Sequence, residues 1–330
     1  MLTPVDDETN LEIKSLGPAR ILSPLRTQLR GEFTAHFVRD DERVLLHDRL
    51  SDVGEDCRSL MDLPSLELAG PREHIYFDPS KVRCGIVTCG GLCPGLNDVI
   101  RGLVMQLWHR YGVRRIYGFR YGLQGFIASY GHDVLDLDPQ AVLNVHQDGG
   151  TFLGSSRGPQ DVVEIVDCIE RMGIGILFPI GGDGAMRGGL AIAEEIGRRG
   201  LKTAVVGVPK TIDNDIMFID QSFGFQTAYS EGVESIKAAH VEASGAPNGI
   251  GLVKLMGRHS GFIACFAALA AGEANFVLIP EVPIELEGEH GLLSMLEKRL
   301  EARGHAVIVV AEGAGQELMM AHPDETMELD

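Results

Sequence analysis

The feature that most constrains this chain is a series of short apolar runs, each of which ends at a junction rich in glycine. The runs begin after Lys81 and alternate with segments of helical periodicity. They predict strands over 84–88, 174–180, 203–208, 250–255, 274–279 and 306–311. Because the apolar residues are continuous within each run, these strands suit a parallel sheet that is covered on both faces. Their alternation with helical segments predicts βαβ units.

Helices are predicted between the apolar runs, over 97–111, 159–172, 185–199, 227–243, 260–271 and 291–303. In the second of them, Val162, Ile165 and Ile169 recur at the spacing that places them on one stripe. This order of elements predicts an α/β fold with mainly parallel sheets. In such open sheets, ligands bind beyond the carboxyl ends of the strands, which is where the glycine-rich junctions lie.

Length and charge narrow the possible functions. A chain of 330 residues is longer than the roughly 250–300 residues that one hydrophobic core fills, so we expect two domains. Residues 1–75 are charge-mixed and have no strong period, which predicts an extension packed on the main body. The net charge of −18 argues against nucleic acid and anionic membranes as partners. No apolar run reaches the roughly 20 residues of a membrane span, and the acidic start differs from a signal peptide. We therefore expect a cytoplasmic protein.

The six cysteines do not resemble a disulfide framework in a chain of this length. Cys89 and Cys93 form a pair in sequence, but no second pair completes a zinc site. We expect free thiols, Cys57 among them.

Two glycine-rich loops can hold an anion. The first spans 88–97 and carries Gly90 and Gly91 between a strand and a helix. Paired glycines let backbone amides approach an anion, and the helix start adds the positive end of its dipole. The second spans 149–159, where Arg157 can neutralise a phosphate. Taken alone, the first loop can equally be a tight turn and the second a flexible surface loop.

A third loop, Gly181-Gly182-Asp183-Gly184, follows the strand predicted over 174–180. A carboxylate between glycines at a strand end suits Mg²⁺, which binds one or two carboxylates together with substrate phosphates. An aspartate before a helix can instead cap that helix. The surrounding glycines favour the interpretation of Asp183 as a metal ligand.

A fourth cluster, Lys210-Thr211-Ile212-Asp213-Asn214-Asp215, combines a cation, a hydroxyl and two carboxylates. If this stretch is extended, Asp213 and Asp215 project to one face. One carboxylate can then accept the proton of an attacking hydroxyl while Lys210 and Thr211 contact phosphate. A polar turn is the alternative, but it does not explain why these charges gather at a strand end.

The fifth junction contains Met256, Gly257 and Arg258. Arg258 can make a forked contact with a phosphate or sugar oxygen. Glu312, at the end of the last predicted strand, is an acceptor suited to sugar hydroxyls. His259 alone is more typical of a surface residue, and we do not assign it to the site.

Taken together, the five motifs resemble the 6-phosphofructokinase family in order and spacing, from about residue 68 to residue 316. Gly-Gly-Asp-Gly alone also occurs in NAD kinases and lipid kinases, so the order of all five carries the resemblance. The extension and Pro209-Lys210 are similar to the ATP-dependent branch that includes plant and trypanosome enzymes. The resemblance implies two doubly wound Rossmann-like domains, with a phosphate-donor domain over 76–224, a sugar-phosphate domain over 225–330 and the active site in the cleft between them.

The resemblance also implies roles for individual residues. The expected ATP-binding positions are Gly90, Gly91, Arg157, Gly182, Asp183, Gly184 and Gly188, with Asp183 as the Mg²⁺ ligand. Asp213 matches the base that takes the proton from the sugar 1-hydroxyl. The other expected catalytic positions are Lys210, Thr211 and Arg258. The expected sugar-phosphate contacts are Thr211, Asp213, Asp215, Met256, Gly257, Arg258 and Glu312.

The implied reaction is transfer of the γ-phosphoryl group of Mg-ATP to the 1-hydroxyl of D-fructose 6-phosphate, a step of glycolysis. Pyrophosphate is the alternative donor, but its branch of the family usually carries a second aspartate where this chain has Gly184. A catalytically silent nucleotide-binding partner or sensor is a further alternative. The resemblance and the symmetry of most soluble assemblies predict a homodimer or homotetramer.

Two features depart from the family pattern. Gly249 stands where short bacterial members have an arginine that reaches the sugar site of the neighbouring subunit. Family members also continue well beyond the strand that precedes Glu312, and that continuation adds basic contacts to the sugar phosphate. From the sequence we expect this second difference to weaken sugar binding more than ATP binding.

Overall fold

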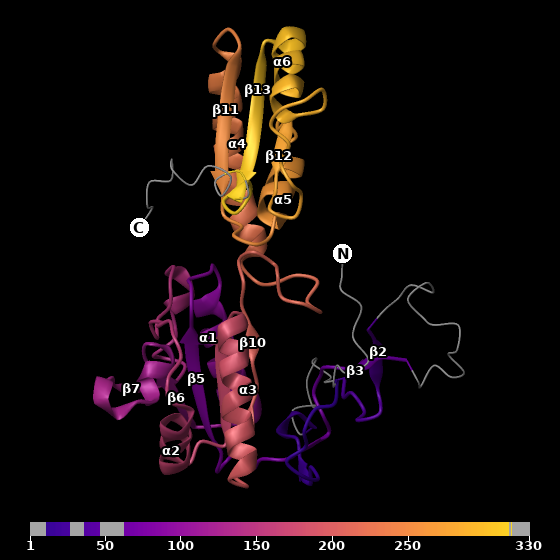
Figure 1. Ribbon diagram of the computed structural model, residues 1–330. Coiled ribbons are helices and arrows are strands. Elements are labelled where there is room, and N and C mark those ends of the chain that lie inside the picture. Colours follow the sequence, from indigo (N-terminus) through magenta and orange to yellow (C-terminus); the bar gives the residue numbers. More distant parts are fainter. Residues whose placement is uncertain (1–10, 27–35, 47–62, 317, 319–330) are drawn as a thin grey trace. The chain divides into compact units, whose positions relative to one another are not determined.

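The computed structural model describes residues 11–26, 36–46, 63–316 and 318 of the chain. These residues form two compact units, Met1–Pro209 and Lys210–Asp330 by their outer bounds (Figure 1). Each unit has its own sheet and its own helices. The expected α/β class with mainly parallel sheets is confirmed.

The units meet in the chain between Pro209 and Lys210, whereas we placed the domain boundary after residue 224. Hydrogen bonds explain the difference. The Ser222 hydroxyl donates to the carbonyl of Thr211, and the Ser260 hydroxyl donates to the carbonyl of Asp213 at 3.0 Å. The segment after Pro209 is therefore held by the second unit.

The first unit contains a six-stranded sheet in the order β10-β8-β5-β6-β7, with β9 also paired to β8. Its strands are β5 (Arg83–Cys89), β6 (Arg115–Phe119), β7 (Val134–Asp136), β8 (Ile176–Gly181), β9 (Ala204–Val205) and β10 (Val208–Pro209). Only the β6–β7 pair in this sheet is antiparallel. The central strand β5 is buried on both faces from Cys84 onward, as its continuous apolar run predicted.

The helices of this unit are α1 (Leu96–Met105), continued by a π-helical segment (Gln106–Tyr111), α2 (Val162–Met172) and α3 (Asp183–Arg198). The carboxylate of Asp161 caps α2, because it accepts the N–H groups of Val163 and Glu164. The α2 and α3 helices share one core cluster with Leu177 of β8. Short 3₁₀ helices lie at Pro24–Arg26, Gly122–Phe126, Ala128–Tyr130 and Val145–Gln147.

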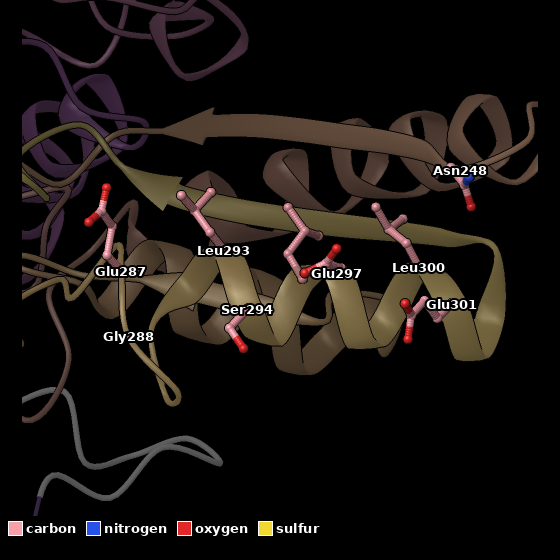
Figure 2. A pocket seen from close by; sticks show the side chains of 9 residues that line it. Asn248, Glu287, Gly288, Leu293, Ser294, Glu297, Leu300 and Glu301 are labelled. Atoms are coloured by element: carbon pink, nitrogen blue, oxygen red, sulfur yellow. The ribbon is translucent and has the colours of Figure 1, made fainter.

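The second unit contains three parallel strands in the order β11-β13-β12. They are β11 (Gly249–Leu255), β12 (Phe276–Leu278) and β13 (His305–Ala311), and the helices are α4 (Phe225–Ser244), α5 (Phe262–Ala271) and α6 (Leu292–Arg303). The α4 and α5 helices pack against each other and on the sheet, and α6 packs on β13. Figure 2 shows α6 in front of the strands with other helices behind them.

Two glycines let α4 lie directly on β11. A Cβ at Gly249 would overlap the carbonyl of Ala243, and one at Gly251 would come within 2.9 Å of the carbonyl oxygen of Ala239. A side chain at position 249 would therefore displace α4 from β11. Ile250 and Leu252 alternate with these glycines along the strand. Their side chains therefore point to the other face, where they are 47% and 68% exposed.

The structure differs from the predicted elements in a few places. The run at 203–208 is divided between β9 and β10, and the sequence analysis missed β6 and β7. Two small antiparallel pairs near the N-terminus were also missed: β1 (Ile21–Leu22) with β4 (His74–Ile75), and β2 (Arg43–Leu45) with β3 (Ser65–Glu67). These strands are too short to give a clear alternating pattern.

Two further expectations concern membranes and cysteines. In the described ranges, no helix is both long and apolar enough to cross a bilayer. The five cysteines within those ranges form no disulfide. Cys57 lies outside the described residues.

The junction after β8 provides a test of packing. We expect Gly181→Ala to lower the free energy of unfolding by about 1–3 kcal/mol, because the added methyl would overlap the Cβ of Ala185 and reach 2.8 Å from the carbonyl oxygen of Cys89. Gly197→Ala, in α3, is the control. Nothing lies within 4 Å of a Cβ there, and we expect a gain of up to about 1 kcal/mol. Urea denaturation would measure both, and equal effects would contradict this account of Gly181.

Candidate active site

In the first unit, the two predicted anion-binding loops lie against each other. The Gly90 N–H donates to the carbonyl of Ser156 at 3.1 Å, and the Ser155 hydroxyl donates to the carbonyl of Gly90 at 2.6 Å. A Cβ at Gly91 would lie 3.7 Å from a guanidinium nitrogen of Arg157. The two glycine-rich loops and one cation therefore meet at the end of β5, and Arg157 can supply positive charge to an anion there.

Two residues that the sequence analysis did not single out hold these loops together. The buried hydroxyl of Thr88 donates to the carbonyl of Gly154 at 2.7 Å. The buried amide of Asn97 donates to the carbonyl of Asp148 at 2.9 Å and accepts the N–H of Phe152 at 2.6 Å. Thr88 is a polar residue within an apolar run, and this signal could have identified it. Asn97 is followed by Asp98 and has no such signal.

Asp183 is the first residue of α3, and Gly182 is the N-cap. The predicted alternative, Asp183 as the cap, is therefore not observed. Its carboxylate is 73% exposed and pairs with Arg187 at 2.7 Å. Within the described part of the chain, no group of three or more His, Cys, Asp or Glu side chains could hold a metal. A single accessible carboxylate nevertheless fits Mg²⁺, which takes its other ligands from phosphates and water.

The other expected donor-site glycines lie along the same helix start. No atom is within 4 Å of a Cβ at Gly184, whereas a Cβ at Gly188 would reach 3.4 Å from Leu123. The surface beside Gly184 is therefore open to a ligand.

In the second unit, the pairing of β11 with β13 brings together four of the predicted sugar-phosphate positions, namely Met256, Gly257, Arg258 and Glu312. Leu255 lies opposite Ala311, and the next N–H, that of Glu312, donates to the Leu255 carbonyl at 2.9 Å. The Gly313 N–H then donates to the Gly257 carbonyl at 3.1 Å. Glu312 is thus placed beside the segment from Met256 to Arg258.

The Lys210–Asp215 stretch is not extended, so the condition for Asp213 and Asp215 to project to one face is not met. Asn214 between them has a positive φ of 56°. The Thr211 hydroxyl donates to a carboxylate oxygen of Asp215 at 2.6 Å and accepts the Asp213 N–H at 3.2 Å. Asp215 is exposed and Asp213 is half-buried, so the two carboxylates have different environments.

The surroundings of Asp213 change its pKa. Burial raises its pKa, and the negative charges of Asp215 and Glu312 raise it further. A backbone hydrogen bond from Arg258 and the charge of His259 oppose this shift. One carboxylate oxygen, Oδ1, is buried and has no hydrogen-bond partner within the described residues. A carboxylate with an unfilled acceptor and a raised pKa suits a general base.

His259, which the sequence analysis set aside, is close enough to Asp213 to lower its pKa. A lone histidine in the sequence gives no sign of this, because the proximity arises from the fold. Lys210 begins the loop that carries Thr211, Asp213 and Asp215, and it is buried, with 6% exposure. Met256 and Arg258 are exposed.

A hollow of about 680 Å³ beside α6 is a different feature (Figure 2). It is lined by Asn248 and by the carboxylates of Glu287, Glu297 and Glu301, among others. These acids would repel a phosphate. The hollow is therefore unsuited to the anionic ligands that the loops at the strand ends can hold.

The chain matches the family model described as "Phosphofructokinase" over residues 83–328. It is 52% identical over 314 residues to the ATP-dependent 6-phosphofructokinase of Amycolatopsis methanolica. The aligned residues cover 95% of this chain and 68% of that protein. It is 44% identical over 313 residues to that of Trypanosoma cruzi, covering 94% of this chain and 63% of that protein. It is also 54% identical over 258 residues to ATP-dependent 6-phosphofructokinase 7 of Arabidopsis thaliana, covering 78% of this chain and 53% of that protein.

Solved structures share the fold. The phosphofructokinase of Pichia pastoris in the T-state matches with a TM-score of 0.62 at 26% identity, over 77% of this chain and 28% of that chain. A pyrophosphate-dependent phosphofructokinase from Marinobacter aquaeolei matches with a TM-score of 0.60 at 22% identity, over 71% of this chain and 61% of that chain, and shows the fold alone. With the family model covering most of the chain and relatives at about half identity, this chain belongs to the phosphofructokinase family.

Proposed function

We propose that this protein is an ATP-dependent 6-phosphofructokinase. It transfers the γ-phosphoryl group of ATP to the 1-hydroxyl of D-fructose 6-phosphate and produces fructose 1,6-bisphosphate and ADP. The observation that carries the proposal is the half-buried Asp213, whose Oδ1 lacks a partner within the described residues and whose surroundings include Arg258 and Glu312. The relatives named above support the choice of reaction.

On the donor side, the residues act mainly by positioning and by charge, which is most of what phosphoryl transfer requires. Amides of the Gly90–Gly91 loop and the guanidinium of Arg157 would hold the donor phosphates, and Gly182, Gly184 and Gly188 would leave room for the nucleotide. Asp183 would hold Mg²⁺ after its carboxylate leaves Arg187. When bound, Mg²⁺ neutralises phosphate charge.

On the acceptor side, the half-buried carboxylate of Asp213 would remove the proton of the sugar 1-hydroxyl. A raised pKa brings this carboxylate closer to the pH at which it works, which makes it a better base. Lys210, Thr211 and Arg258 would stabilise the transferring phosphoryl group. The sugar phosphate would be held by Arg258 together with Asp215, Met256, Gly257 and Glu312.

ATP is favoured over pyrophosphate by the names of the relatives and by the open surface at Gly184. A catalytically silent partner is a less economical interpretation, because it gives no reason for a desolvated carboxylate beside an arginine and a glutamate.

We also propose a homodimer or homotetramer in the cytoplasm. Helix α5 consists of ten residues without a charged or hydrogen-bonding side chain other than the thiol of Cys265. It nevertheless leaves Phe262, Phe266 and Leu269 exposed, at 44%, 44% and 80%. Helices that are apolar on all sides are normally covered, and a second subunit would cover this one.

The assigned base can be tested directly. We expect Asp213→Ser to lower kcat by about 10²–10⁴-fold, because proton transfer by a positioned side chain contributes that much. ATP affinity should change little. A coupled assay for fructose 1,6-bisphosphate and calorimetric titration with ATP would measure the two quantities. Asp220→Asn, an exposed acid of the same loop, is the matched control and should keep parental turnover. Turnover of the serine variant within a few-fold of the parent would disprove the assignment.

The raised pKa of Asp213 also predicts how stability depends on pH. Since the folded-state pKa lies above the unfolded value, ionisation of Asp213 opposes folding, and this cost appears as the pH rises through the two values. Asp213→Asn should therefore raise Tm at neutral pH, and the gain should disappear below the ordinary range of an aspartic acid. Thermal unfolding of parent and variant across this range would measure it. A gain in Tm that grows on acidification would have the wrong sign.

The choice of donor can be tested at Gly184. Gly184→Asp should be accommodated, because no atom lies within 4 Å of the new Cβ. Its charge should lower kcat/KM for ATP by roughly tenfold or more, since juxtaposed like charges cost several kcal/mol. Gly184→Ala adds no charge and should retain most of the activity with ATP. Steady-state assays with ATP and with pyrophosphate would compare the variants. Parental kcat/KM for ATP in the aspartate variant would remove Gly184 from the donor site.

A further inference from the structure

The backbone between the two site carboxylates adopts a conformation that few residues tolerate. Asn214 has a φ of 56°, in the left-handed region. For residues other than glycine this region is disfavoured, and asparagine is among the few that adopt it repeatedly. The turn at Asn214 explains why Asp213 and Asp215 have different environments.

The side chain of Asn214 spans the loop that it interrupts. Its Nδ2 donates to the carbonyl of Asp220 at 3.1 Å, and its Oδ1 accepts the N–H of Ser222 at 2.7 Å. Ser222 is buried, and its hydroxyl donates to the carbonyl of Thr211. These three bonds connect the two ends of the loop around Asp213.

A second contact fixes Asp213 from the other side. The hydroxyl of Ser260 donates to the Asp213 carbonyl at 3.0 Å, and the same oxygen accepts the N–H of Phe262, the first residue of α5, at 3.3 Å. The backbone of Asp213 is therefore attached to a helix start, while the loop that carries it is closed by Asn214 and Ser222.

We infer that Asn214 is a positioning residue for the phosphoryl-transfer reaction: with Ser222 it holds the 211–222 loop in the conformation that presents the Asp213 carboxylate to the acceptor hydroxyl. This inference rests on the proposed function. It assigns to Asn214 no contact with a substrate. Its effect is exerted through the backbone of Asp213.

Asparagine satisfies all the requirements at this position, whereas glycine, aspartate and alanine each fail at least one. Glycine adopts the same φ but makes no side-chain bond. Aspartate can accept the Ser222 N–H but cannot donate to the Asp220 carbonyl, and it would add a charge between two carboxylates. Alanine lacks the bonds and is strained at this φ.

The experiment compares Asn214→Gly with Asn248→Gly. Asn248 has nearly the same φ, 55°, and lies in the turn before β11, at the end of that strand opposite to Met256 (Figure 2). Both variants relieve the same backbone constraint, and only the first removes the bonds to Asp220 and Ser222. We expect Asn214→Gly to lower kcat by about 10- to 100-fold, because a misplacement of about 1 Å can cost that much, with KM for ATP within about threefold. Asn248→Gly should stay within about twofold of the parent in both.

A second measurement is independent of turnover. Hydrogen exchange at the Ser222 amide should become faster in Asn214→Gly and stay at the parental rate in Asn248→Gly. Unchanged exchange would overturn the loop-closing role, and kcat within threefold of the parent would overturn the catalytic one. A parent without turnover would overturn the proposed function and the catalytic part of this inference with it. The exchange result would then still decide whether Asn214 closes the loop.

Discussion

The parallel pairing of β11 with β13 is the interaction on which the candidate acceptor site depends. It is continuous over seven residue pairs and is extended by the bonds from Glu312 to Leu255 and from Gly313 to Gly257. Because adjacent parallel strands end at the same edge, this register brings Glu312, which follows β13, beside the segment after β11 that contains Arg258. A shift by one residue would turn Glu312 to the opposite face.

The two units position their candidate site groups by different interactions. In the first, short side chains and backbone groups hold one loop to another, as in the bonds from Thr88 to Gly154 and from Ser155 to Gly90. The guanidinium of Arg157 thereby comes close to Gly91 at the end of β5. In the second, burial raises the pKa of the Asp213 carboxyl, and the negative charges of Asp215 and Glu312 raise it further. The first arrangement suits binding of negative charge, and the second suits removal of a proton.

Much of the fold could be predicted from the sequence, and the assigned roles of the site residues remain predictions. Long apolar runs such as the one that became β5 are buried on both faces and therefore have a strong signal. The glycine-rich junctions marked the strand ends because close backbone approach excludes a Cβ, as it does at Gly181. By contrast, the short strands β6 and β7 depend on pairing with neighbours. The turn at Asn214, the proximity of His259 and the segment after Pro209 depend on hydrogen bonds and contacts between residues far apart in sequence, and no local pattern encodes them.

The edge of the second sheet has a consequence for the behaviour of the protein in solution. The β11 strand ends the described sheet on one side, and two of its side chains, Ile250 and Leu252, are exposed apolar groups. An edge strand of this length and character can serve as a template for unintended pairing between molecules. The net charge of −18 opposes such encounters, since like-charged molecules repel. Salt shortens the range of this repulsion to about 10 Å at 0.1 M while leaving the apolar strand unchanged, so colloidal stability depends on ionic strength.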